Sequence, residues 1–176
     1  MHKLGLTTAL LIAIAAPAAT RAEQIQASLI GYEEVPAVST PASGEFRAMI
    51  NHDDQSIDYE LTYSGLQGTV QQAHIHFAQP AVNGSIVIWL CQTTTTPAPA
   101  TVAALTPFCP QPGGTVTGHI TAANVITAGT ASQQILAGEL DEVIAAIRGG
   151  VTYANVHATP LNPGGEIRGQ IQGSSR

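Results

Sequence analysis

The sequence predicts an all-β fold, an antiparallel β-sandwich or Greek-key-like barrel of about eight strands with one short capping helix. First, apolar and polar residues alternate with period two along most of the chain, so that every second side chain faces one core. Second, Gly, Pro and Asn residues separate these alternating segments, as they do in antiparallel sandwiches and barrels. Third, a single segment departs from this pattern and has the period of a helix.

The expected strands follow one another through most of the chain. They cover residues 24–29, 44–50, 56–63, 73–78, 84–91, 114–120, 151–157 and 165–171. The stretch 84–91 is apolar on both faces, which is typical of a central strand. Asn83-Gly84 is expected to turn the hairpin that leads into this stretch.

Residues 139–150 form the expected helix. Its apolar side chains recur at i, i+3, i+4 and i+7, namely Leu140, Val143, Ile144 and Ile147. Acidic residues fall in the first turn and Arg148 in the last, and two glycines follow, which suits the ends of a helix. The expected role of this helix is to cap the sandwich by packing, without chemistry of its own.

Residues 1–22 are predicted to be a signal peptide, which leaves one domain at 23–176. A short basic start precedes an apolar run at 4–15, and small residues precede the expected cleavage before Glu23. The run is too short to span a bilayer, and no later stretch is apolar for long enough, so no membrane insertion is expected after cleavage. The mature protein is therefore expected to be exported, either periplasmic or secreted.

The charge of the mature chain excludes two classes of partner. Cleavage removes Lys3 and Arg21 from the six basic residues and none of the twelve acidic ones, so four basic residues remain and the net charge becomes −8. Such a surface repels phosphate backbones and anionic lipids. We therefore expect no nucleic acid and no membrane surface as partner.

Two cysteines, Cys91 and Cys109, are expected to form one disulfide in an exported chain. They bracket a loop rich in Thr, Pro and Ala that carries no charge. In the chain-entropy model, closing a loop of this size stabilises the fold by roughly 3 kcal/mol. We expect the bridge to be structural.

Three histidines are predicted to meet off the core face. Ala73 and Ile75 face the core, so His74 and His76 project the other way from their strand, as His157 does from its own. Three imidazoles with an open position are a usual mononuclear site for Cu(II) or Zn(II). Asn155 is expected to hold the second ring nitrogen of a ligand.

Two other histidines have weaker standing. His119 is a candidate fourth ligand, although an exposed strand residue is the competing interpretation. His52, beside two aspartates, is expected to belong to a turn and is left outside the site.

A metal-free interpretation stays open beside this one. The histidines would then hydrogen-bond to carbonyls or face solvent, and the protein would be an envelope-structural module or bind another extracytoplasmic protein. In that case Glu166 and Arg168 lie on one face for a structural ion pair, with Glu33 and Glu34 as alternative partners.

Four motifs resemble the CHRD (chordin-type) domain, with a match from about Gln24 to Ile171. They are E-V-P at 34–36, A-H-I-H at 73–76, N-V-H at 155–157 and N-P-G-G-E-I-R-G-Q at 162–170. The resemblance implies a secreted, β-rich domain that often occurs alone in bacteria, but it does not imply an activity. His74, His76, Asn155 and His157 fall inside these motifs, whereas His52 and His119 fall outside them.

The histidine pattern also weakly resembles the copper half of copper–zinc superoxide dismutase. Between Phe77 and Gly118 there is no His, Asp or Glu, so the zinc-bearing loop has no counterpart. The net charge, with no Lys or Arg expected near the site, would repel an anionic substrate rather than steer it. A copper-dependent oxidoreductase of this type is therefore not favoured, and whether the protein is an enzyme is left open.

The sequence thus predicts one copper ion bound by His74, His76 and His157, with zinc as the alternative metal. Binding, storage and slow redox chemistry all fit this ligand set. Protonation of ordinary imidazoles is expected to release the ion below about pH 6.

Overall fold

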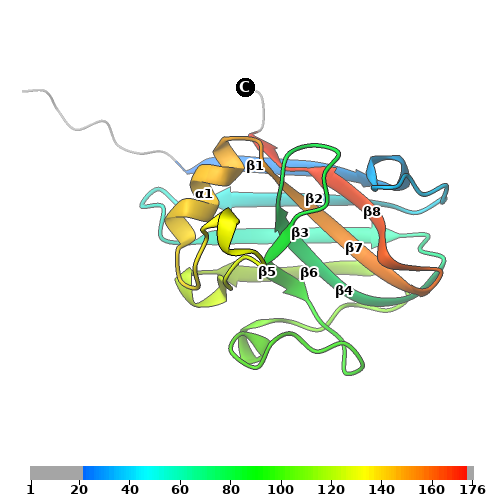
Figure 1. The fold of residues 1–176 in the computed structure, drawn as a ribbon. Coiled ribbons are helices and arrows are strands. Elements are labelled where there is room, and N and C mark those ends of the chain that lie inside the picture. The colour runs from blue at the N-terminus through cyan, green and yellow to red at the C-terminus, as the bar shows by residue number, and fades with distance from the viewer. Residues whose placement is uncertain (1–21, 174–176) are drawn as a thin grey trace, which may run out of the picture.

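The computed structural model describes residues 22–173 as one antiparallel β-barrel that is nearly closed (Figure 1). The strands are β1 (Glu23–Ile30), β2 (Ser43–Ile50), β3 (Ile57–Ser64), β4 (Gly68–Phe77), β5 (Ser85–Cys91), β6 (Gly114–Ile120), β7 (Thr152–Pro160), β8 (Asn162–Gln170) and the short β9 (Gln172–Gly173). The strand order β5-β4-β7-β8-β1-β2-β3-β6 and its antiparallel pairings confirm the predicted fold class. The signal peptide predicted at 1–22 lies, except for its last residue, outside the described residues.

The helix α1 (Leu140–Arg148) is the only α-helix in the described part of the chain and lies at one end of the barrel (Figure 1). Val143, Ile144 and Ile147 are buried in the main core, as the helical period predicts. Four short 3-10 helices lie in the loops, at Gly31–Glu33, Ala103–Leu105, Ala122–Asn124 and Ala131–Gln133. Among residues 22–173, no helix combines the length and the apolar character needed to cross a bilayer.

The ends of the sheet meet at a seam between β5 and β6, which no ladder joins in the described strands. The predicted disulfide between Cys91, at the end of β5, and Cys109, ahead of β6, is formed across this seam. The Tyr59 hydroxyl, from β3, also donates to the Leu90 carbonyl on β5 at 2.5 Å. The seam is therefore closed by one covalent bond and by a side chain that reaches across it.

The two ends of the described chain lie side by side. Strand β9 pairs with the start of β1, with Gly173 opposite Ile25. This pairing lies on the far side of the sheet order from the seam.

The hairpin between β4 and β5 is present, but Asn83-Gly84 is not its two-residue turn. The connection runs from residue 78 to residue 84, and its turn bond joins the Val82 amide to the Gln79 carbonyl. The Asn83 side chain instead donates to the Val35 carbonyl at 2.9 Å, which ties this loop to the segment after β1. The prediction failed because Asn-Gly also suits a longer loop that makes tertiary contacts.

A second buried layer covers the outer face of the β5-β4-β7-β8 half of the sheet. It consists of polar side chains, among them Glu34, His74, His76, Asn155, His157, Glu166 and Arg168. At one side Ala98 and Val102, from the loop closed by the disulfide, pack on Trp89 of β5. The face that the alternation assigns to solvent is therefore buried beneath loops.

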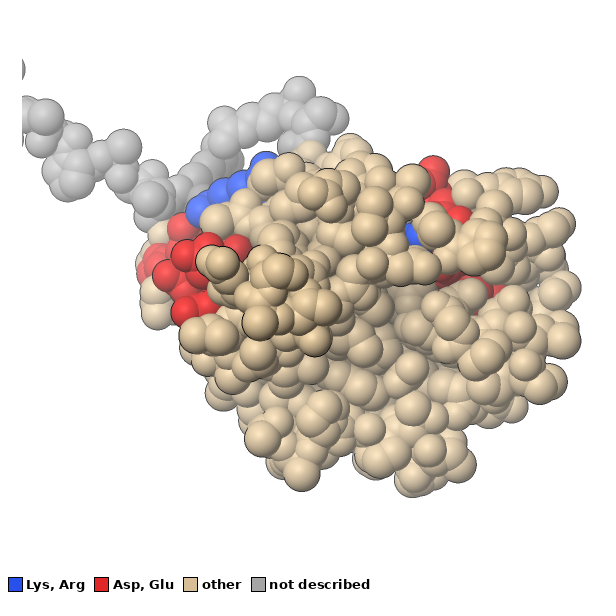
Figure 2. Space-filling model, viewed as in Figure 1, with Lys and Arg blue, Asp and Glu red and all other residues tan. Residues whose placement is uncertain are grey.

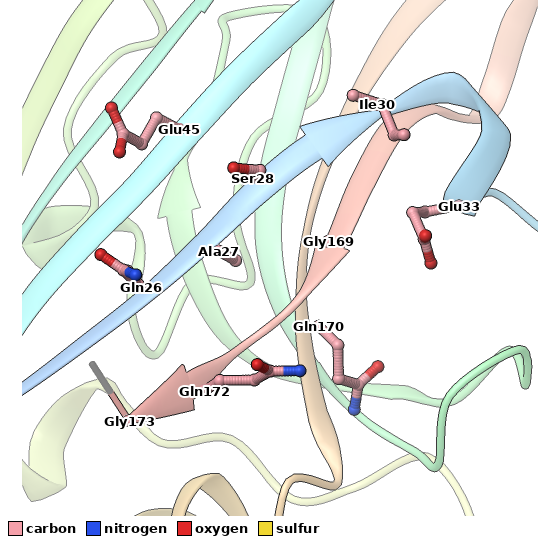
Figure 3. Close-up of a pocket in the computed structure, with 10 residues that line it drawn as sticks. All are labelled: Gln26, Ala27, Ser28, Ile30, Glu33, Glu45, Gly169, Gln170, Gln172 and Gly173. Carbon is pink, nitrogen blue, oxygen red and sulfur yellow. The ribbon is translucent and has the colours of Figure 1, made fainter. Parts of the chain in front are cut away.

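Charged side chains are sparse over much of the molecular surface. In Figure 2 the acidic side chains gather at two ends of the visible face and leave its middle uncharged. The described pairs Arg148–Glu23 and Arg148–Asp54 form part of the exposed charge near α1.

Candidate metal centre

The adjacent strands β4 and β7 bring His74, His76 and His157 together, as the sequence predicts. Each residue offers one ligand atom, and these atoms all lie within 4.8 Å of one another. In the ladder His74 lies opposite Asn155, and His76 opposite Tyr153, so the imidazoles come from neighbouring positions on one sheet face.

The three histidines lie off the barrel core, as predicted, but they are buried and do not lie on the molecular surface. Their exposed fractions are 0% for His74, 8% for His76 and 6% for His157. The alternation correctly turned them away from the barrel core, but it carries no information about the loops that cover the opposite face.

Two main-chain carbonyls fix the tautomers of His76 and His157. The Nδ1 atom of His76 lies 3.0 Å from the Gly84 carbonyl oxygen, and that of His157 lies 2.9 Å from the Pro163 carbonyl oxygen. A carbonyl only accepts, so each Nδ1 carries the proton and donates it. Each Nε2 is therefore left with a lone pair, the form that binds a metal.

The third nitrogen lies next to one of these lone pairs. Nδ1 of His74 is 3.2 Å from Nε2 of His157. In the absence of a metal, His74 donates its Nδ1 proton to this acceptor. A metal bound by both nitrogens would replace this proton, which would move to Nε2 of His74, a buried atom without a hydrogen-bond partner, so that the imidazole stays neutral. Nε2 of His76 is buried and has no hydrogen-bond partner, so it fits the third position.

Burial keeps these imidazoles uncharged. Desolvation, reinforced by the neighbouring His157 and His76, holds the pKa of His74 well below its usual value. Desolvation also lowers the pKa of His76 to about 4 and lowers that of His157. Neutral imidazole is the ligating form, so acid is expected to compete for this site only below the pH of about 6 that ordinary imidazoles would give.

Aromatic side chains enclose two of the rings. Trp89 meets His74 edge to face, with ring centroids 4.3 Å apart. Tyr153 stacks on His76 with centroids 4.6 Å apart and an interplanar angle of 2°. The guanidinium of Arg168 lies 4.5 Å from the Tyr153 ring centroid.

The family-model comparison matches the CHRD domain over residues 25–171. The chain belongs to the CHRD family. The comparisons with curated proteins and with solved structures gave no match. The disulfide of this CHRD protein fits an oxidising compartment.

The motifs that carried the resemblance converge on the histidine cluster. Asn155, expected to hold a ring nitrogen, instead donates from Nδ2 to Oε1 of Glu34 at 2.5 Å. Glu34 comes from the E-V-P motif, and burial raises its pKa to about 7 although Arg168 lies close. The CHRD motifs therefore form one network behind the imidazoles, and main-chain carbonyls take over the orienting role predicted for Asn155.

Glu166 and Arg168 are both buried, and each has other partners. Nε of Arg168 lies 3.6 Å from Oε2 of Glu34 and donates to the Glu33 carbonyl at 2.6 Å. Oε1 of Glu166 accepts from the Thr40 hydroxyl at 2.6 Å and from the Gln67 amide at 2.8 Å. The ion pair of Arg168 is thus made with Glu34, one of the two alternative partners named from the sequence.

The two other histidines within residues 22–173 lie outside the cluster. His119, the candidate fourth ligand, is on β6, where its Nδ1 lies 2.6 Å from Oδ1 of Asp58 and its side chain is 58% exposed. His52 lies in the turn between β2 and β3, as expected. The expectation that no basic residue lies near the site is wrong, because Arg168 lies 4.5 Å from the centroid of the Tyr153 ring, which stacks on His76.

Sequence reasoning missed four contributors to the site: Gly84, Pro163, Trp89 and Tyr153. The first two act through carbonyl groups, which every residue has, so side-chain patterns cannot reveal them. The alternation does place Tyr153 on the same face as His157, but no sequence pattern indicates that its ring stacks on His76.

Proposed function

We propose that this CHRD protein is an exported, mononuclear copper-binding protein with Nδ1 of His74, Nε2 of His76 and Nε2 of His157 as ligands. The observation that carries the proposal is the buried, unpartnered Nε2 of His76 beside two nitrogens 3.2 Å apart. A buried polar atom without a partner is unfavourable, and a metal ion would satisfy it.

Copper is favoured over zinc by the ligand set. All three ligands are neutral imidazoles, and copper binds such nitrogen donors more tightly than zinc does. Zinc remains the alternative metal. Export is supported by the signal-like leader and by the disulfide.

Metal binding or storage with slow redox chemistry suits the surroundings better than fast turnover of an anion. Arg168 is 3% exposed and already binds Glu33, Glu34 and Val82. A buried, engaged guanidinium steers an anion poorly, and the net negative charge of the chain repels it.

The test is electron paramagnetic resonance of the mature protein titrated with Cu(II), beside His76→Ala and His119→Ala variants. We expect a saturable one-to-one nitrogen-rich signal in the wild type and in His119→Ala, and its loss in His76→Ala. Thermal unfolding of the metal-free variants provides the folding control. A weak, heterogeneous signal shared by all three proteins would contradict the proposal.

The competing function is a metal-free module that binds another extracytoplasmic protein or supports the envelope. The 3.2 Å separation of His74 and His157 supports it, since this distance also suits an ordinary hydrogen bond. Under this function His76→Ala changes stability and leaves the copper content of the protein unaltered.

A further inference from the structure

We infer that the histidine cluster is selective for oxidation state and binds Cu(I) more tightly than Cu(II). The inference rests on the proposed copper binding and adds the valence of the ion. It follows from the charge of the ligands, from the groups behind them and from the number of ligands that the fold supplies.

The proposed ligands carry no charge. The three ligand residues are neutral, and the free energy needed to move an ion out of water rises with the square of its charge. A buried site without an anionic ligand therefore disfavours a divalent ion more than a monovalent one. The buried carboxyls of Glu34 and Glu166 are not members of the cluster of potential ligands, since Glu34 binds Asn155 and Arg168, and Oε1 of Glu166 binds Thr40 and Gln67.

The positive charge of Arg168 lies behind His76, on the far side of the Tyr153 ring. Strand β7 lies between β4 and β8, so His76 and Arg168 approach the Tyr153 ring from its two sides and form a three-layer stack. The Arg168 guanidinium lies 4.5 Å from the Tyr153 ring centroid, and the His76 ring centroid lies 4.6 Å from it. At this separation the Arg168 charge repels a metal ion bound at Nε2 of His76, and the repulsion is twice as large for Cu(II) as for Cu(I).

The number of ligands in the cluster also favours Cu(I). Within residues 22–173 the cluster contains three potential ligands, and His119 is held elsewhere by Asp58. Cu(II) favours four or more ligands in tetragonal geometry, whereas three nitrogens suffice for Cu(I). His74 is 0% exposed, and Trp89, on which Ala98 and Val102 of the disulfide-closed loop pack, lies against its ring, which limits the approach of further ligands from that side.

The redox step involves only the metal. Cu(II) takes one electron from a donor such as ascorbate and becomes Cu(I). Because the ligands are neutral imidazoles in both states, no proton has to be gained or lost at the site.

The experiment measures both affinities of the mature protein under anaerobic conditions. Cu(I) is titrated against bathocuproine disulfonate, and Cu(II) against nitrilotriacetate. We expect Cu(I) to bind at least about 100-fold more tightly than Cu(II). This ratio raises the reduction potential by about 118 mV relative to a site of equal affinities, at 59 mV per tenfold for one electron.

Arg168→Gln tests the contribution of the stacked charge, and Arg47→Gln is its matched control on the exposed face of β2, where the Arg47 side chain is 65% exposed. We expect Arg168→Gln to reduce the ratio several-fold and Arg47→Gln to leave it unchanged. If Arg168→Gln does not fold, the wild-type ratio still decides.

The outcomes separate this inference from the proposed function. Cu(II) binding as tight as or tighter than Cu(I) binding overturns the valence selectivity and leaves copper binding intact. Failure to bind copper in either state, with a folded protein, overturns the proposed function itself.

Discussion

The backbone of Gly165 lies against the carboxyl group of Glu34. A Cβ atom at Gly165 would come within 2.7 Å of Oε1 of Glu34 and within 2.6 Å of Nδ2 of Asn155. The residue also has a φ of +131°, which side chains rarely tolerate. A glycine is therefore needed at this position for the Glu34–Asn155 contact that backs the histidine cluster.

Gly165→Ala is expected to lower the free energy of unfolding by about 2 kcal/mol or more, because backbone strain adds to the overlap with Glu34. The control is Gly164→Ala, since an added Cβ at Gly164 meets nothing within 4 Å. Urea unfolding of the two variants measures the difference. Equal midpoints would show that the Gly165 contact can relax without loss.

Trp89 is expected to report on the metal, because it is the single tryptophan of the chain and its ring lies 4.3 Å from that of His74. Binding of paramagnetic Cu(II) should quench most of the Trp89 fluorescence at one equivalent, whereas Zn(II) should quench little. His76→Ala should abolish the quenching. Quenching that rises without saturation and persists in the variant would indicate binding elsewhere.

The stability of the metal-free protein is expected to depend on His76. Its pKa falls from 6.5 to about 4 on folding, so the unfolded chain binds this proton more readily. The His76 contribution is thus complete above pH 6.5 and is lost as the pH falls toward 4, a change of about 3 kcal/mol at 1.36 kcal/mol per unit.

Glu34 acts in the opposite direction, because its pKa rises from 4.5 to about 7 on folding. Its contribution is present below pH 4.5 and is lost as the pH rises through 7. Urea unfolding in the presence of a chelator, between pH 4 and pH 7.5, should therefore give a free energy of unfolding that rises more with pH in Glu34→Gln than in the wild type, and rises less in His76→Gln. Curves parallel to that of the wild type for both variants would contradict these assignments.

Replacing both Cys91 and Cys109 by alanine is expected to lower the free energy of unfolding by about 3 kcal/mol, because the bridge closes a segment with a sequence separation of 18 residues. The loop that packs on Trp89 should loosen, and the Trp89 emission should shift to longer wavelength. Chemical denaturation followed by fluorescence measures both effects. An unshifted emission maximum would show that the loop holds without the bridge.

Much of the barrel could be predicted because the period-two alternation of apolar and polar residues indicates which side chains of each strand face the core. Ile75 and Val156, for instance, are fully buried in it as expected. The helix at Leu140–Arg148 could equally be predicted, because its apolar residues recur with the helical period. The three clustered histidines could be named because imidazoles are rare in this chain.

The burial of the site could not be read in this way. Whether His74 faces water depends on how the loop ahead of Cys109 and the segment around Glu34 pack. Both packing arrangements involve residues that are distant from His74 in the sequence. The roles of Gly84 and Pro163 were hidden for another reason, since a carbonyl group has no sequence signature. Local patterns therefore specified the faces of the strands and left open what covers them.

Because β9 pairs with the start of β1, the same barrel could be built by a chain that begins and ends at another point. Since Gly173 lies opposite Ile25, a short linker could join Gly173 to Glu23 without stretching any strand. New termini opened in the exposed turn between β2 and β3 would then leave every ladder and all three imidazoles in place. Such a circular permutant would carry its ends away from the histidine cluster, so that a fluorophore or surface tether could be attached without approaching these three residues.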